Sequence, residues 1–302
     1  MEKMLEKARP FVYRSARPLD FARWQYLFEN GSAEAVLDRL AAYQNADGGF
    51  GHALEADCWN PCSTPMQTWA ATRIVAELAG ADPRHPLIAG LLAYLASGDG
   101  FDGHRWQGLN AAPSNDRYPH APWWACTGAP ESGYNPTASL IGFMLRYAGA
   151  DSPAGRLAAR LLPEACAAFE SRFPLDSMHE AACYAELYEA LQAAGLPQAP
   201  ALEALLRRQI ACSITADTSR WQSEYVCRPS LFVRSRQSGL YAGCEAICRF
   251  ECDFLAKTQN DDGTWNVTWQ WDAYPEAWAV SKNWWKTDLI LRNLAFVRAM
   301  EA

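Results

Sequence analysis

Gln44-Asn45-Ala46-Asp47-Gly48-Gly49-Phe50-Gly51 is the most informative stretch of the chain, and it continues through an acidic loop to Ser63-Thr64-Pro65 and Trp69. It has the composition of a helix end, a glycine-rich turn, a loop and the start of a second helix. The Asp-Gly-Gly sequence favours a turn, because glycine takes the positive φ values that other residues resist. Ser63 or Thr64 can cap the next helix, and Pro65 suits its first turn. The stretch therefore predicts two helices joined by a structured loop.

The same pattern returns near the C-terminus as Gln259-Asn260-Asp261-Asp262-Gly263-Thr264-Trp265, again between two helical runs. A degenerate third copy is Asp99-Gly100-Phe101-Asp102-Gly103-His104-Arg105-Trp106. Internal repeats change the fold prediction, because each helix pair in a repeat protein buries its apolar face against its neighbours. The chain is therefore expected to consist of repeated helical hairpins.

Apolar residues recur at helical spacing along most of the chain, and no segment has a convincing strand pattern. We expect about eleven helices, among them residues 19–29, 33–44, 66–78, 85–95, 137–147, 155–170, 178–193, 201–214, 239–258 and 275–300. Two long irregular loops interrupt them, residues 98–136 and 217–236. Loops of this length in a compact domain are uncommon and often functional. The second of them carries Trp221, Tyr225 and Arg228.

The two complete turns resemble the QW-type repeat of the squalene-cyclase and protein-prenyltransferase superfamily, also called the prenyltransferase/squalene oxidase repeat. In that repeat a glutamine, an Asp-Gly turn and an aromatic residue close each helical hairpin. The resemblance implies a single all-α domain, residues 1–302, folded as a terpenoid cyclase-like α/α toroid of about five or six hairpins around a central cavity. An open solenoid is the structural alternative. The resemblance leaves the chemistry open, because function lies in sites and not in folds.

The composition narrows the choice of partners. Twenty-seven basic and 34 acidic residues give a formal net charge of −7, which argues against nucleic acid as the main partner. No apolar run reaches the about 20 residues of a membrane span, and the charged N-terminus lacks the apolar segment of a secretion signal. We therefore expect a soluble cytoplasmic protein whose ten cysteines are mostly thiols. The sequence leaves its oligomeric state open.

The acidic loop after the first turn is the main candidate for a catalytic site. It carries His52, Glu55, Asp57 and Trp59. A carboxylic acid in an aromatic, water-poor cavity has a raised pKa, so it can stay protonated and donate a proton to an alkene or epoxide. Terpenoid cyclases work in this way. Asp57 would be a substitute proton donor, assisted by Glu55 and His52, but no family motif carries this assignment over. The chain departs from the family because it has no Asp-x-Asp-Asp motif.

A second acidic and aromatic loop follows the C-terminal turn. Trp269, Trp271, Asp272 and Tyr274 occupy the position there that Glu55 and Asp57 occupy in the first copy. With Trp59 and with Trp123 and Trp124 of the first long loop, they are the predicted substrate-binding residues. The two loops are expected to face one aromatic cavity that binds an apolar, isoprenoid-type small molecule. Aromatic rings there could stabilise a carbocation as they stabilise other cations.

Three alternatives stay open. Tryptophans beside paired carboxylates, such as Asp57 and Asp272, are also the apparatus of a glycan hydrolase or lyase. A non-catalytic repeat protein for binding or scaffolding would use its Asp-Gly turns and carboxylates only for structure. A zinc site, as in protein prenyltransferases, could draw on Asp57, Cys58 and Cys62, although the ligand set is incomplete. No glycine-rich phosphate-binding motif is present, which argues against nucleotide cofactors.

Overall fold

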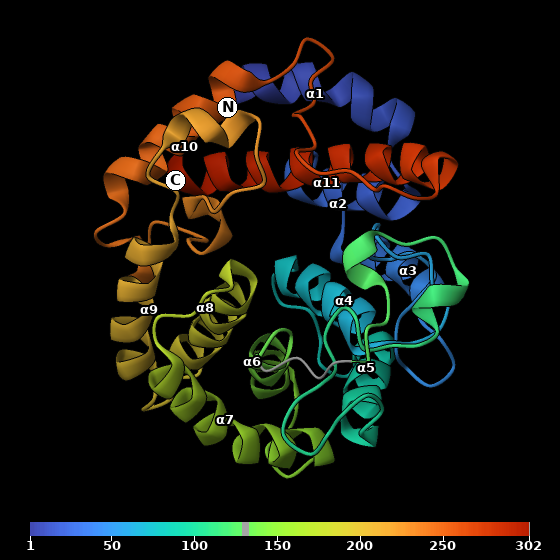
Figure 1. Cartoon of the computed structure of the whole chain (residues 1–302), viewed down its shortest axis with the longest axis vertical. Coiled ribbons are helices and arrows are strands. Elements are labelled where there is room, and N and C mark those ends of the chain that lie inside the picture. The colour runs from blue at the N-terminus through green and yellow to red at the C-terminus, as the bar shows by residue number, and fades with distance from the viewer. Residues whose placement is uncertain (129–132, 302) are drawn as a thin grey trace. The chain divides into compact units, whose positions relative to one another are not determined.

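The computed structural model describes residues 1–128 and 133–301, and within them the chain is all-α, as predicted (Figure 1). These residues form eleven α-helices and no strand, apart from isolated bridges between single residues. The helices are α1 Glu2–Ser15, α2 Pro18–Phe28, α3 Ala33–Leu40, α4 Pro65–Glu77, α5 Pro86–Ser97, α6 Thr137–Tyr147, α7 Pro153–Arg172, α8 Met178–Ala193, α9 Ala199–Ser213, α10 Glu245–Thr258 and α11 Pro275–Glu301. Part of the predicted loop 98–136, residues 129–132, lies outside the described residues.

The chain divides into two compact units. Unit 1 combines both ends of the chain, Met1–Arg39 and Ile210–Ala302, and unit 2 is the middle of the chain, Leu40–Gln209. The expectation of one toroidal domain therefore stays a prediction, and each unit is described by itself. In the described part of the chain, no helix is both long enough and apolar enough to span a membrane.

Unit 2 is built around α6, which packs against α4, α7 and α8 (Figure 1). Nine of the eleven residues of α6 are buried, so this helix is apolar around its whole circumference, as a central helix must be. Gly142 lets α6 approach α8 closely, because a Cβ at this position would lie 3.1 Å from the Cα of Leu187. Unit 2 is thus organised around one almost wholly buried helix that its neighbours cover.

Unit 1 is organised by the long helix α11, which packs against α1, α2 and α10 (Figure 1). A buried charge network joins α2 to α11. Arg23 donates from Nη1 to Asp20 Oδ1 at 3.3 Å and to Asp288 Oδ1 at 3.2 Å. Buried ions need such partners, because an unpaired charge in the protein interior is strongly destabilising. The network therefore fixes how α2 lies on α11.

The repeat turns have the same geometry in the two units. Gln44 Nε2 donates to Gly48 O at 3.0 Å and to Leu87 O, in the first turn of α5, at 3.0 Å. Gln259 Nε2 donates to Gly263 O at 3.0 Å and to Met4 O, in the first turn of α1, also at 3.0 Å. Both glycines have a φ of 86°. The glutamine thus closes its own turn and ties it to the start of a neighbouring helix.

The degenerate third copy keeps part of this geometry. Trp106 N donates to Thr137 Oγ1 at 2.9 Å, as Phe50 N donates to Thr68 Oγ1 at 3.1 Å in the first copy. In both copies the aromatic side chain is buried. The aromatic position of the repeat therefore anchors the turn to the start of a helix that follows it.

The structure differs from the prediction at α1, at the end of α3, which stops at Leu40 and not at residue 44, and at the start of α10. The predicted helices begin at residue 19, whereas the structure adds α1, whose buried Met4, Ala8, Phe11 and Val12 form one face. The proline inside α1, Pro10, obscures this face in the sequence, and packing against α11 outweighs it. Helix α10 starts at Glu245 and not at residue 239, because the chain first makes a 3-10 turn and Gly243 takes a φ of 90°.

Candidate binding groove

The predicted catalytic residues lie on one loop of unit 2. Glu55 and Asp57 are in contact, because Asp57 N donates to Glu55 Oε2 at 2.7 Å. Asp57 is only 4% exposed. His52 is exposed, and its Nε2 lies 2.9 Å from Asn45 Oδ1 in the neighbouring turn. The structure therefore brings Glu55 and Asp57 together, while the imidazole of His52 bonds to the repeat turn.

The first long loop pairs with this acidic loop. Ala121 N donates to Asp57 O at 2.8 Å, and Trp59 N donates to Pro119 O at 2.9 Å. Two tryptophans follow in the long loop, of which Trp124 is 1% exposed and Trp123 is 40% exposed. Trp124 is thus part of the core of unit 2, and Trp123 is the more accessible of the two rings.

The predicted zinc ligands do not gather. Cys58 Sγ donates to Asn115 Oδ1 at 3.4 Å, and burial raises the pKa of this thiol to about 12. Cys62 is exposed. Within residues 1–128 and 133–301, no three His, Cys, Asp or Glu side chains are placed so that they could hold a metal ion. Asp57, Cys58 and Cys62 therefore do not form a zinc site.

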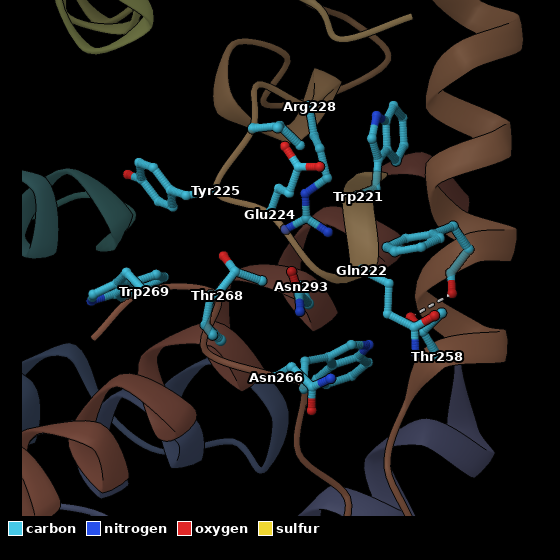
Figure 2. Close-up of a pocket in the computed structure, with 14 residues that line it drawn as sticks. Trp221, Gln222, Glu224, Tyr225, Arg228, Thr258, Asn266, Thr268, Trp269 and Asn293 are labelled. Carbon is cyan, nitrogen blue, oxygen red and sulfur yellow. Dashed lines mark hydrogen bonds between the residues drawn. The ribbon is translucent and has the colours of Figure 1, made fainter. Parts of the chain in front are cut away.

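The second predicted loop, in unit 1, contributes one residue to a cavity. Trp271 is buried and stacks on Trp278, with ring centroids 5.4 Å apart. Asp272 and Tyr274 are exposed at the start of α11. Trp269, in contrast, lines a cavity of about 90 Å³ whose walls all belong to unit 1. Figure 2 shows its lining, which comes from the loop after α9, from α10, from the second repeat turn and from α11.

Two tryptophans fix the aromatic wall of this cavity. Trp221 is 3% exposed, and its Nε1 donates to Thr215 O at 2.9 Å. Trp265, the aromatic residue of the second repeat turn, is 5% exposed and donates from Nε1 to Leu255 O at 3.0 Å. Both N–H groups are thus paired with backbone carbonyls, which holds the rings in place. The repeat turn therefore supplies part of the cavity wall.

Tyr225 and Trp269 form the more accessible part of the wall. Their rings meet edge to face at 5.3 Å, and Trp269 meets Trp285 in the same way at 5.0 Å. Tyr225 is 52% exposed. The Nε1 of Trp269 is buried and has no hydrogen-bond partner among the described residues. Buried N–H groups are nearly always paired in proteins, so this one suggests a site that a ligand or water completes.

Polar groups face the same cavity. Asn293, on α11, is only 3% exposed, and its side-chain amide has no hydrogen-bond partner among the described residues. Gln222 and Thr268 also line the cavity, and Figure 2 labels both of them with Asn293 among the lining residues. An amide offers two donors and one acceptor, so a ligand that covers it must supply hydrogen-bond partners. The cavity thus presents unused donors and acceptors next to aromatic rings.

A buried carboxylate holds the arginine of the wall. Glu251, on α10, is 0% exposed and accepts hydrogen bonds from Ser230 N at 2.8 Å and from Ser230 Oγ at 2.6 Å. Arg228 Nε lies 3.4 Å from Glu251 Oε1. Burial raises the pKa of Glu251, and Arg228 and Ser230 oppose this shift. Figure 2 shows the guanidinium of Arg228 among the lining residues.

The carboxylate on the wall belongs to Glu224, which is paired with another arginine. Arg220 donates to Glu224 Oε2 from Nε at 2.9 Å and from Nη2 at 2.7 Å. These hydrogen bonds lower the pKa of Glu224. Glu224 therefore stays ionised near neutral pH, whereas a general acid needs a raised pKa.

An open polar groove continues from the cavity. It has a volume of about 540 Å³ and shares Gln222, Asn266 and Thr268 with the cavity. Its charged lining residues are Asp261 and Asp262 of the repeat turn and Lys282 and Lys286 of α11. The two acidic and two basic side chains give the groove a formal net charge of zero, whereas the whole chain has a net charge of −7. The cavity and the groove together are the candidate binding groove.

Only part of this groove is predictable from the sequence. Trp269 is a predicted binding residue, and the loop 217–236 stands out because it places Trp221, Tyr225 and Arg228 outside any helical pattern. The sequence gives no indication that Asn293 lines a cavity, because an asparagine within a long helix is usually exposed to solvent.

Compared with protein-family models, with curated proteins and with solved structures, the chain gives no match.

Proposed function

We propose that unit 1 binds a carbohydrate in the candidate binding groove. The observation that carries the proposal is a cavity walled by Tyr225 and Trp269 in which the buried Nε1 of Trp269 has no partner and the Asn293 side chain, 3% exposed, makes no hydrogen bond to the described residues. Sugar rings combine apolar C–H faces, which pack on aromatic rings, with hydroxyl groups that need donors and acceptors. Both requirements are met within one cavity.

The same chemistry disfavours an isoprenoid in this groove. A hydrocarbon chain could pack against Tyr225 and Trp269, but it would leave the amide of Asn293 and the N–H of Trp269 without partners. Each buried polar group left unpaired costs about 1–3 kcal/mol. The isoprenoid expectation concerned a central cavity of a toroid, and it stays a prediction.

The proposed activity is binding without cleavage. Glycoside hydrolysis requires a protonated carboxylic acid and a second carboxylate on either side of the bond. Glu224, in the cavity wall, has a lowered pKa, which is the opposite of what the acid needs. A binding role therefore agrees best with the groove.

Removing one aromatic ring at a time tests the proposal. We expect Tyr225→Ala and Trp269→Ala each to weaken oligosaccharide binding about tenfold, equivalent to about 1.4 kcal/mol. Trp123→Ala removes a 40% exposed ring of unit 2 and is the matched control. Isothermal titration calorimetry with neutral and acidic trisaccharides, and with farnesol as the apolar comparison, gives the dissociation constants. Tight binding of farnesol without binding of any sugar would reject the proposal.

We also propose that the helical hairpins are arranged as an α/α toroid. Support comes from the shared geometry of the two repeat turns, in which Gln44 and Gln259 make equivalent pairs of hydrogen bonds. Turns repeated in this way are typical of repeat proteins in which each hairpin packs on the next. Small-angle X-ray scattering distinguishes a closed ring from an extended solenoid, and an elongated particle would contradict the toroid.

A further inference from the structure

We infer that the candidate binding groove recognises a carboxylate on its ligand through Arg228 and Asn293. Combined with the proposed function, on which this part rests, the ligand becomes an acidic sugar, that is, an oligosaccharide containing a uronic acid. Three features carry the inference: how Arg228 is held, which of its nitrogens are free, and what lies beside it.

Arg228 is anchored at one end of its guanidinium. Its Nε lies 3.4 Å from Oε1 of Glu251, which is itself fixed by both the N–H and the hydroxyl of Ser230. The guanidinium carbon lies 5.9 Å from the ring centroid of Phe254. Among the described residues, no partner is found for the two terminal nitrogens, Nη1 and Nη2. The edge of the guanidinium that binds a carboxylate with two parallel hydrogen bonds is therefore unoccupied.

Asn293 adds a neutral donor to the same place. It is 97% buried, as its 3% exposure shows, and it lines the cavity together with Arg228. Figure 2 places its amide below the guanidinium, on the side away from the loop that carries Arg228. An amide and a guanidinium edge that line one small cavity suit an anion with two oxygens, because the amide N–H₂ can donate to an oxygen that the arginine also binds.

Neighbouring carboxylates leave this edge of Arg228 available. Glu224 is bound through one oxygen by both Nε and Nη2 of Arg220. Glu251 contacts Arg228 through Nε and satisfies its other bonds with Ser230. A wholly buried anchor holds the guanidinium ready before the ligand arrives, which lowers the entropy lost on binding.

Trimers of galacturonate, glucuronate and mannuronate, each compared with its own methyl ester, provide the test. The ester keeps the sugar and removes the charge. We expect at least one acid to bind about tenfold or more tightly than its ester, because charge-assisted paired hydrogen bonds are roughly twice as strong as neutral ones. Arg228→Gln should reduce the affinity for the acid to that for the ester. Arg249→Gln, which removes an exposed arginine of α10 that lines neither the cavity nor the groove, should leave the difference unchanged.

Two further variants keep the test valid if Arg228→Gln does not fold. Arg228→Lys keeps the charge and loses the planar pair of donors, so the preference for the acid should fall by about tenfold. Asn293→Asp leaves Arg228 in place and adds a negative charge, so it should weaken binding of the acid more than binding of the ester. Titration calorimetry measures each dissociation constant, and circular dichroism confirms the fold of each variant.

The outcomes separate the inference from the proposed function. Equal affinity for acid and ester, unchanged in Arg228→Gln, would overturn the carboxylate inference and leave carbohydrate binding intact. A trimer of neutral sugars that carries a sulfate group is the further comparison. If it binds the unaltered protein as tightly as the acid does, and binds Arg228→Lys with the same affinity, the specificity for carboxylate is overturned. If neither acid nor ester binds while a neutral trisaccharide does, only the inference is wrong; if no sugar binds at all, both the inference and the proposed function are wrong.

Discussion

The chemistry of single residues in this protein is set by what each of them contacts once the chain is folded. Asn293 lies within a regular helix, yet its amide faces the cavity without a partner among the described residues. The pKa values of Glu224 and Glu251 are shifted in opposite directions by their surroundings. Hydrogen bonds from Arg220 lower the pKa of exposed Glu224, whereas burial raises the pKa of Glu251. Residue type alone would have assigned the two glutamates equal behaviour.

The cysteines give a prediction about individual side chains. Burial raises the pKa of Cys58, Cys227 and Cys248 to about 12. Because the thiolate is the reactive form, only about one molecule in ten thousand carries it at pH 8 for each of these residues. Cys62 and Cys212 are exposed. In the native protein at pH 8, we expect a short pulse of iodoacetamide to alkylate Cys62 and Cys212 and to spare the three buried thiols.

Mass spectrometry of the digested protein measures alkylation at each cysteine. Raising the pH from 8 to 9 should increase labelling of the buried cysteines about tenfold, since the thiolate fraction rises with pH below the pKa, yet labelling should stay slight. Labelling of Cys58 or Cys227 as fast as that of Cys62 would show that these sites are open to solvent. A denatured sample, in which all ten cysteines react, is the control.

Among the elements, the repeat turns are the best determined by sequence. Gly48 and Gly263 each have a φ of 86°, and a Cβ at either position would lie 2.1 Å from a backbone carbonyl oxygen, that of Gly90 or that of Lys7. A side chain is thus excluded twice, by the backbone conformation and by the neighbouring helix. The glutamine of each turn bonds to that same helix, so the turn and its neighbour form one structural piece.

Alanine substitutions at matched glycines test whether the close contact between turn and neighbouring helix contributes to stability. Gly48→Ala should destabilise the protein by about 2–5 kcal/mol, since strain at positive φ adds to the overlap with the Gly90 carbonyl. Gly80→Ala is the control in the same unit, because Gly80 has a φ of 70° but nothing within 4 Å of the position that a Cβ would take. It should cost only about 1–2 kcal/mol.

The corresponding pair in unit 1 is Gly263→Ala, with Gly243→Ala as its control. Gly243 has a φ of 90° and open space around it. Denaturation with urea, followed by circular dichroism, gives the free energy of unfolding for each variant. Equal losses within each pair would show that the close approach of the turn to the neighbouring helix contributes nothing to stability.

The elements also show which parts of the fold a sequence can predict. Helices α6 and α8 have the predicted bounds, because residues that cap or break helices flank both, such as Ser177 before α8. Helix α1 escapes prediction because Pro10 interrupts its pattern and because the packing that stabilises it comes from α11, far away in the sequence. Local signals thus locate most helices, while tertiary packing decides the rest.

The binding groove is less predictable for the same reason. Trp269 is recognisable because tryptophans in a loop are unusual, and the loop 217–236 is conspicuous by its length and aromatic content. The buried anchor Glu251 and the unpaired Asn293 lie inside helices α10 and α11, where the sequence shows only a charged and a polar position. Their roles arise when the loop packs on these helices, and no local pattern encodes that contact.

In the molecule as a whole, both ends of the chain form unit 1, and the candidate binding groove lies entirely within it. The residues predicted as catalytic, His52, Glu55 and Asp57, belong to unit 2. The two hypotheses therefore place ligand binding in different parts of the protein. Because of this division, carbohydrate binding in unit 1 can be tested by locating the bound ligand.

The indole N–H signals of the 13 tryptophans supply that test, since they are distributed over both units. Each signal in the two-dimensional ¹H–¹⁵N NMR spectrum is assigned by replacing one tryptophan with phenylalanine, and the protein is then titrated with the tightest-binding trisaccharide. We predict that Trp269 shifts most, with smaller shifts at Trp221 and Trp265, while Trp106 and Trp124 of unit 2 stay unchanged. Shifts confined to tryptophans of unit 2, or no shift at Trp269 at saturation, would contradict carbohydrate binding in this groove.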